Sequence, residues 1–143
     1  MLALRYLTVS GTVTVGNNCF RNCPLLENII LSDGHIVIGN GCFADAAAQD
    51  LLIIGCTGTI GSECFTGMYR LEYINIEDGI TEIGAGSFCR CSNLMTIELP
   101  ASITAIGEGC FADCGNAYIC APKGSYAIAY AKEHELPYTE TNT

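Results

Sequence analysis

The sequence is poor in histidine and in basic residues, and both shortages exclude kinds of site. Only two histidines occur, His35 and His134, well separated along the chain. We therefore expect no nucleophile that depends on a histidine base. Six Lys and Arg residues stand against fifteen Asp and Glu, for a formal net charge of -9. This charge repels phosphate backbones and anionic lipid headgroups, so we expect no nucleic-acid partner, whereas a cationic partner would be attracted.

Long apolar runs are also missing. No run approaches the ~20 residues that cross a bilayer, so we expect no membrane insertion. Residues 1–10, MLALRYLTVS, lack the charged start, apolar centre and cleavage site of an export signal. The 143 residues are half apolar, which predicts a single domain with a substantial core.

The phenylalanines reveal an internal repeat. Each follows the previous one after 23, 22, 23 and 23 residues, and a β-branched residue followed by glycine precedes each at constant distance. The phenylalanines are Phe20, Phe43, Phe65, Phe88 and Phe111. Self-similarity at this period predicts a solenoid in which the rings pack inward and form the spine of the core.

The two most regular units, residues 71–93 and 94–116, predict the course of one coil. Each opens with a short strand whose apolar residues alternate, as in Ile74 and Ile76. A turn and a second short strand follow, and the phenylalanine with the cysteine three residues later fits one helical turn. No unit buries its apolar side alone, so the first strands must stack into one long parallel sheet. In the unit at residues 50–70, either Leu51 or Leu52 faces inward, and the first unit has the same ambiguity.

Seven of the ten cysteines follow the repeat, either immediately before a phenylalanine or three residues after it. Other units carry Ser87, Ala46 or Met68 at these positions, so the space does not require a bond. We interpret these cysteines as reduced core thiols, with one or more disulfides as the alternative.

The last coil departs from the pattern at residues 118–122. Ser125 is a candidate N-cap for a helix over residues 126–134, which we expect to close the C-terminal end of the core. A partner-binding helix is the alternative. The predicted divisions are about five repeats over residues 4–117, a cap over 118–138 and a short tail over 139–143, all within one domain, 1–143.

The units resemble the BspA-like leucine-rich repeats, whose pattern is approximately LxxIxLPxxITxIGxxAFxxCxxL. The segment LMTIELPASITAIGEGCFADC agrees at nearly every defining position, and the resemblance spans residues 4–117. It implies a right-handed leucine-rich repeat solenoid that serves as an interaction surface, typically in adhesion, on secreted or surface-anchored microbial proteins. No ligand-binding residue comes with the motif.

No catalytic, cofactor or metal site is predicted. Three Gly-x-Gly elements, at 39–41, 84–86 and 107–109, occupy one phase of the repeat, which indicates backbone turns rather than phosphate loops. Cys89 and Cys91 lack two further zinc ligands at short spacing. The acidic residues of the unit at 71–93 indicate a solvated face rather than a calcium site.

The outward side of the long sheet is the predicted binding surface for a protein ligand. It passes from apolar to acidic, and we predict that it contains Ile30, Leu52, Ile54, Tyr73, Asn75, Glu77, Thr96 and Glu98. The alternative is that β-branched residues simply favour strands.

The N-terminal end suggests a second contact. Leu2, Leu4 and Leu7 enter the pattern with no evident cap, so either upstream residues are missing or two chains join there end to end. The hypothesis for function is a non-enzymatic protein-binding or adhesion module, extracellular or on a cell surface as part of a longer protein. An intracellular scaffold is the alternative, favoured by unpaired thiols and the missing export signal.

Overall fold

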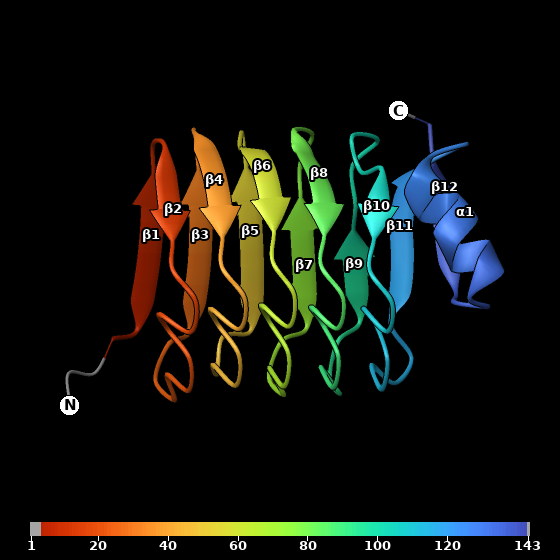
Figure 1. The fold of residues 1–143 in the computed structure, drawn as a ribbon. Helices are drawn as coiled ribbons and strands as arrows, with labels where there is room; N and C mark the ends of the chain where they lie inside the picture. Colours follow the sequence, from red (N-terminus) through yellow and green to blue (C-terminus); the bar gives the residue numbers. More distant parts are fainter. Residues whose placement is uncertain (1–3, 143) are drawn as a thin grey trace.

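The coils stack into two parallel sheets that face each other across the core (Figure 1). The computed structural model describes residues 4–142. The long sheet has the order β1-β3-β5-β7-β9-β11-β12, and the short sheet has the order β10-β8-β6-β4-β2. The elements are β1 Tyr6–Ser10, β2 Val13–Val15, β3 Asn28–Ser32, β4 His35–Ile38, β5 Asp50–Ile54, β6 Thr57–Ile60, β7 Tyr73–Ile76, β8 Ile80–Ile83, β9 Thr96–Glu98, β10 Ala105–Ile106, β11 Tyr118–Pro122, α1 Tyr126–Glu133 and β12 Tyr138–Thr141. The predicted parallel solenoid with a C-terminal helix is confirmed.

Burial settles the strand register that the sequence left open. Leu51 and Ile53 are fully buried, whereas Leu52 and Ile54 face outward and are half-buried. In the first unit Leu7 packs against the core, while Tyr6 is 63% exposed. The inward set is therefore the one that places isoleucine and leucine beside Ile29 and Ile74 of neighbouring strands.

The phenylalanine rings form a continuous stack through the molecule. Successive ring centroids lie 5.1–5.6 Å apart with interplanar angles of 1–8°, an offset parallel arrangement that aromatic rings favour. Phe43, Phe65 and Phe88 are fully buried, Phe111 is nearly so, and Phe20 in the first coil is half-buried. The inward prediction is confirmed, and the stack ends edge-on against Tyr130 of α1, 6.3 Å from Phe111.

The segment around each phenylalanine differs in one detail from the predicted helical turn. It consists of hydrogen-bonded turns in which the residues two before and two after the ring have left-handed backbone, as at Gly86 and Arg90, with φ of 64° and 60°. This alternation points every second N–H at the next coil. Gly86, Phe88 and Arg90 donate to the carbonyls of Glu108, Cys110 and Ala112 at 2.8–3.0 Å. Coil-to-coil hydrogen bonding therefore replaces the i to i−4 bonds of a helix.

All ten cysteines are free. Six are buried, among them Cys42, Cys64 and Cys110 beside the phenylalanine stack. Burial raises the pKa of Cys42 to about 11 and that of Cys110 to about 12. The prediction of core thiols was wrong for Cys19, which is exposed because no described residue covers that side of the first coil.

The C-terminal cap contains the predicted helix and an additional strand. Helix α1 buries Ala127, Ile128, Tyr130 and Ala131 against the last coil. Ser125 occupies the N-cap position with extended backbone, but its hydroxyl makes no capping hydrogen bond, contrary to expectation. After the helix, β12 pairs in parallel with β11 and extends the long sheet. No helix within residues 4–142 is long and apolar enough to cross a membrane.

Candidate binding face of the long sheet

The outward side chains of the long sheet form one ordered surface, which we call the sheet face. Because neighbouring strands pair in register, its central row aligns equivalent residues of successive coils. That row consists of Thr8, Ile30, Leu52, Asn75, Glu98 and Cys120. A second row, nearer the strand starts, contains Tyr73 and Thr96, which pair directly. The eight residues predicted from the sequence all lie on this face or, for Glu77, at its margin directly after β7.

The apolar part of the sheet face is formed by β3 and β5. Ile30, Leu52 and Ile54 are half-buried although they point away from the core. Strands lie about 4.8 Å apart, so each side chain is flanked by its neighbours in the adjacent strands. The exposed edges of these residues form a narrow apolar strip rather than isolated side chains.

A hydrogen bond between Tyr73 and Glu98 joins β7 to β9 on the polar part of the face. The tyrosine hydroxyl donates to Oε2 of Glu98 across one strand boundary. Burial of the ring, followed by the bond to Glu98 and its negative charge, raises the pKa of Tyr73 to about 12. The hydroxyl therefore remains protonated at physiological pH and holds the Glu98 carboxylate in a fixed orientation.

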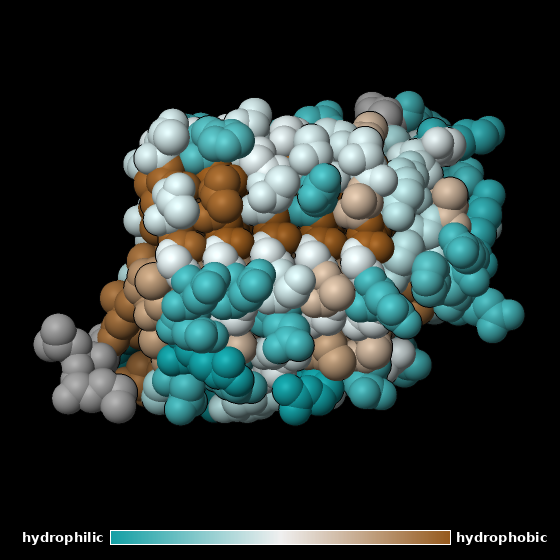
Figure 2. Space-filling model, in the orientation of Figure 1, coloured by the Kyte–Doolittle hydropathy of each residue, from teal (hydrophilic) through white to brown (hydrophobic). Residues whose placement is uncertain are grey.

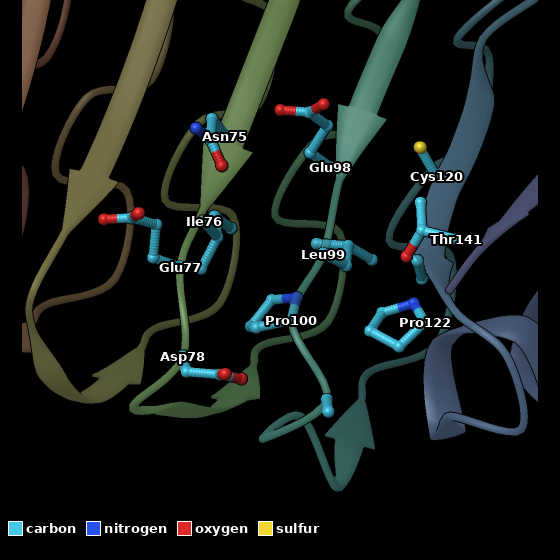
Figure 3. A pocket seen from close by; sticks show the side chains of 12 residues that line it. Asn75, Ile76, Glu77, Asp78, Glu98, Leu99, Pro100, Cys120, Pro122 and Thr141 are labelled. Atoms are coloured by element: carbon cyan, nitrogen blue, oxygen red, sulfur yellow. The ribbon is translucent and has the colours of Figure 1, made fainter. Parts of the chain in front are cut away.

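Beside this pair the sheet face is hollowed, with a volume of about 330 Å³ (Figure 3). Three acidic side chains, Glu77, Asp78 and Glu98, surround a floor that includes Pro100. The remaining lining residues are Asn75, Ile76, Leu99, Ala101, Cys120, Ala121, Pro122 and Thr141. The pKa of the Cys120 thiol is raised by burial and by the Glu98 charge. The hollow suits a partially buried side chain of a partner, and its carboxylates favour a cationic one.

Sequence reasoning found one wall of this hollow and missed the other. Asn75, Glu77 and Glu98 were predicted from the repeat, but Cys120, Pro122 and Thr141 were not. The last three come from β11 and β12, where the sequence departs from the repeat pattern. The only available signal was the alternation of residues 118–122, which places Cys120 in line with Glu98.

No cluster of three or more His, Cys, Asp and Glu side chains within residues 4–142 is arranged to hold a metal ion. Cys91 points into the core, whereas Cys89 is half-buried in the turn. Gly41, Gly86 and Gly109 of the Gly-x-Gly elements all have φ near 65° in equivalent turns. They serve as turn residues, as the sequence analysis predicted.

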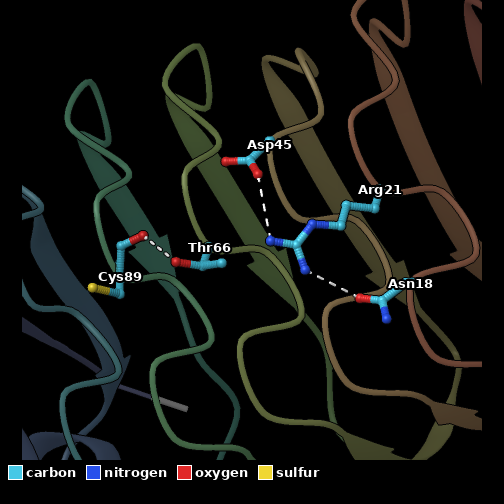
Figure 4. A network of polar contacts seen from close by, with 5 residues as sticks. All are labelled: Asn18, Arg21, Asp45, Thr66 and Cys89. Atoms are coloured by element: carbon cyan, nitrogen blue, oxygen red, sulfur yellow. Dashed lines mark hydrogen bonds and ion pairs between the residues drawn. The ribbon is translucent and has the colours of Figure 1, made fainter.

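The view onto the short sheet shows apolar side chains gathered over β2 and β4, where Val37 is 39% exposed (Figure 2). On the turn side, Arg21 lies 3.9 Å from Asp45 and donates to Oδ1 of Asn18 at 3.3 Å, while Thr66 donates to the Cys89 carbonyl at 3.0 Å (Figure 4). The exposed Arg21–Asp45 pair stabilises weakly, whereas the hydroxyl of buried Thr66 joins neighbouring coils.

The stacked parallel coils, the aligned phenylalanines and the single long sheet define a leucine-rich repeat solenoid. The model of the BspA type leucine rich repeat region matches residues 4–130 with six copies, and the chain belongs to this family. No curated protein matches the sequence significantly.

Three solved structures share the fold. A leucine rich repeat protein of T. pallidum has 20% identity and a TM-score of 0.71, with 82% of this chain and 59% of that chain covered. A leucine rich cell surface protein of Faecalibacterium prausnitzii A2-165 has 25% identity and a TM-score of 0.73, with 90% and 35% covered. A leucine-rich repeat protein of Bacteroides ovatus has 19% identity and a TM-score of 0.66, with 96% and 42% covered. The chain thus spans about one third to three fifths of the length of these proteins.

Proposed function

We propose that this chain is a non-enzymatic protein-binding module of a microbial surface or secreted leucine-rich repeat protein, with a role in adhesion. The observation that carries the proposal is the sheet face. It combines an apolar strip on β3 and β5 with a hollow of about 330 Å³ between β7 and β11. A protein ligand that covers both parts would bury apolar edges and place a basic side chain near Glu77 and Glu98.

Two further findings support this proposal. The family is built from leucine-rich repeats, whose stacked strands offer an extended surface suited to protein ligands. One structural relative, the Faecalibacterium prausnitzii protein, is described as a cell surface protein. The acidic character of the hollow and the net charge of -9 favour a ligand with a basic contact region.

Charge reversal on the sheet face is expected to weaken ligand capture without unfolding the protein. The test variant combines Tyr73→Ala with Glu77→Lys and Glu98→Lys. Loss of the apolar ring and reversal of two charges should weaken binding to a captured partner at least about tenfold, measured by surface plasmon resonance. Because these positions are at most half-buried, the melting temperature should change little.

A matched variant carries the same type of charge change on other surfaces. Glu82→Lys lies on the short sheet and Glu63→Lys lies in a turn, and both side chains are exposed. This control should retain the affinity of the unmodified chain. Equal affinity for the test and control variants would place the binding site elsewhere.

An intracellular interaction scaffold is the second candidate, and the ten free cysteines favour it. Disulfides are scarce where the cytosolic thiol pool keeps cysteines reduced. Growth of the source cells followed by surface-restricted biotinylation separates the two candidates, since only a surface protein is labelled before lysis.

Self-association at the N-terminal end is part of the same proposal. Leu4 is 37% exposed and Leu7 is half-buried, while Leu2 lies outside the described residues. Strand β1 forms an open edge of the long sheet within residues 4–142, which offers unpaired backbone to a second chain. Sedimentation that remains monomeric at high protein concentration would rule out this contact.

A further inference from the structure

In the turn around Phe111, three backbone amides have no hydrogen-bond partner within residues 4–142. The equivalent amides of the earlier coils are all hydrogen-bonded. At each earlier junction, the amides two before, at and two after the phenylalanine donate to carbonyls of the next coil. For the turn around Phe65, the acceptors are the carbonyls of Ala85, Ser87 and Cys89, at 2.8–2.9 Å. In the last turn the corresponding donors are Gly109, Phe111 and Asp113, and no residue within 4–142 accepts from them.

The backbone of the last turn points these amides away from the rest of the solenoid. Gly109 and Asp113 have φ of 65° and 58°, matching 64° at Gly86 and 60° at Arg90 in the preceding coil. Equal dihedral angles give the N–H groups equal directions. The carbonyls that face the preceding coil are already bonded to it, so the three free amides face the C-terminal side.

The phenylalanine turns of successive coils lie next to one another, and we call this row of turns the turn column. Helix α1 leaves the C-terminal end of the turn column accessible. A hollow of about 210 Å³ lies between the turn and the cap, lined by Gly109, Phe111, Ala112, Tyr130, His134 and Leu136. Gly109, Ala112 and Asp113 are exposed. The walls formed by Phe111, Tyr130 and Leu136 are apolar, so amide donors and an apolar recess lie side by side.

The chemistry of a matching ligand follows from the earlier junctions. At each of those junctions, three amides donate to the carbonyl oxygens of three alternate residues in one backbone segment. A small anion fits poorly, since Glu108 and Asp113 lie in or beside the turn and the Glu133 charge reaches Tyr130. Neutral backbone carbonyls satisfy the donors without this repulsion.

We propose that this end of the turn column binds a peptide segment of a partner protein that adopts the same hydrogen-bonded turns as a coil, independently of the sheet face. Backbone carbonyls of alternate peptide residues accept from Gly109, Phe111 and Asp113, and one apolar peptide side chain enters the hollow beside Phe111. A basic residue next to it faces Glu108 or Asp113. The backbone pairing is comparable to the addition of a strand to a sheet edge, but here the added segment is a turn.

Amide shifts in ¹H–¹⁵N spectra test the proposal on the intact chain. The probe is the blocked peptide Ac-Gly-Leu-Gly-Lys-Gly-amide, titrated to about 5 mM, a range suited to a small peptide contact. The amide protons of Gly109, Phe111 and Asp113 should move downfield with a common saturation curve. Gly86, Phe88 and Arg90 are internal controls, because their amides are already paired within the molecule.

Two comparisons complete the test. Sodium acetate at the same concentration should not reproduce the shifts, and Ala112→Trp, which fills the hollow, should weaken peptide binding at least about tenfold. Ala129→Trp, on the exposed side of α1, should bind as the unmodified chain does. Absence of shifts at the three amides, shifts confined to other residues, or equal shifts with acetate would each overturn the proposal.

Discussion

Replacing Phe65 by alanine is expected to lower the free energy of unfolding by about 3–5 kcal/mol. The ring is fully buried and stacks between Phe43 at 5.4 Å and Phe88 at 5.1 Å. Its removal loses the burial of the ring and leaves a cavity. Neighbouring coils cannot close that cavity readily, since the Phe65 amide is bonded to the Ser87 carbonyl at 2.8 Å. Equilibrium denaturation, followed by circular dichroism, measures the loss.

Phe20→Ala is the matched control for this prediction. Phe20 occupies the same position of the repeat, but it is half-buried and stacks on one phenylalanine ring, that of Phe43 at 5.3 Å. Its replacement should cost about 1–2 kcal/mol, because less apolar area returns to water. Equal losses of unfolding free energy for the two variants would show that burial within the ring stack does not determine the stability of the core.

Gly79→Ala is expected to destabilise the protein by about 3–5 kcal/mol, through a backbone collision added to an unfavourable dihedral angle. Gly79 has φ of 121°, and a Cβ there would lie 2.1 Å from the Cys56 carbonyl oxygen in the preceding coil. That oxygen belongs to the backbone, so a whole coil must shift to accept a methyl group. The midpoint of urea denaturation reports the change.

Gly11→Ala separates the two contributions. Gly11 stands at the equivalent position of the first coil and also has positive φ, 88°, but a Cβ there would meet nothing within 4 Å. Only the dihedral cost of about 1–2 kcal/mol should remain. If Gly79→Ala and Gly11→Ala cost the same, close approach of neighbouring coils is not what requires glycine at this position.

Most of the fold could be predicted from the repeat, because only one arrangement of the coils turns all its apolar positions inward. Alternation of Ile74 and Ile76 fixed the inward side of a strand, and the phenylalanine period fixed how coils align. The turn type was not recoverable, because a helical turn and a pair of β-turns both bring Phe88 close to Cys91. Arg90 also adopts a left-handed backbone conformation. Residues other than glycine rarely adopt it, so the sequence did not predict it.

The candidate site was predictable only where the repeat is regular. Asn75 and Glu98 follow from strand alternation, and the structure places both in the hollow. Strand β12 and its Thr141 were missed, because residues 138–141 lack alternating apolar residues and form a strand only by pairing with β11. The unpaired amides of the last turn could not be predicted from the sequence either. They are unpaired because no further coil supplies the carbonyl oxygens that pair the equivalent amides of earlier coils.

Selective labelling of Cys19, Cys42, Cys64 and Cys110 tests most directly whether the coils stack as described. These four cysteines share one position of the repeat, immediately before a phenylalanine. Cys19 is exposed, whereas the other three are fully buried, with pKa values raised by burial. Iodoacetamide, read out by peptide mass spectrometry, should modify native Cys19 at least about 100-fold faster than the other three, which require unfolding to react. Similar rates for all four in the native protein would contradict the stacked solenoid.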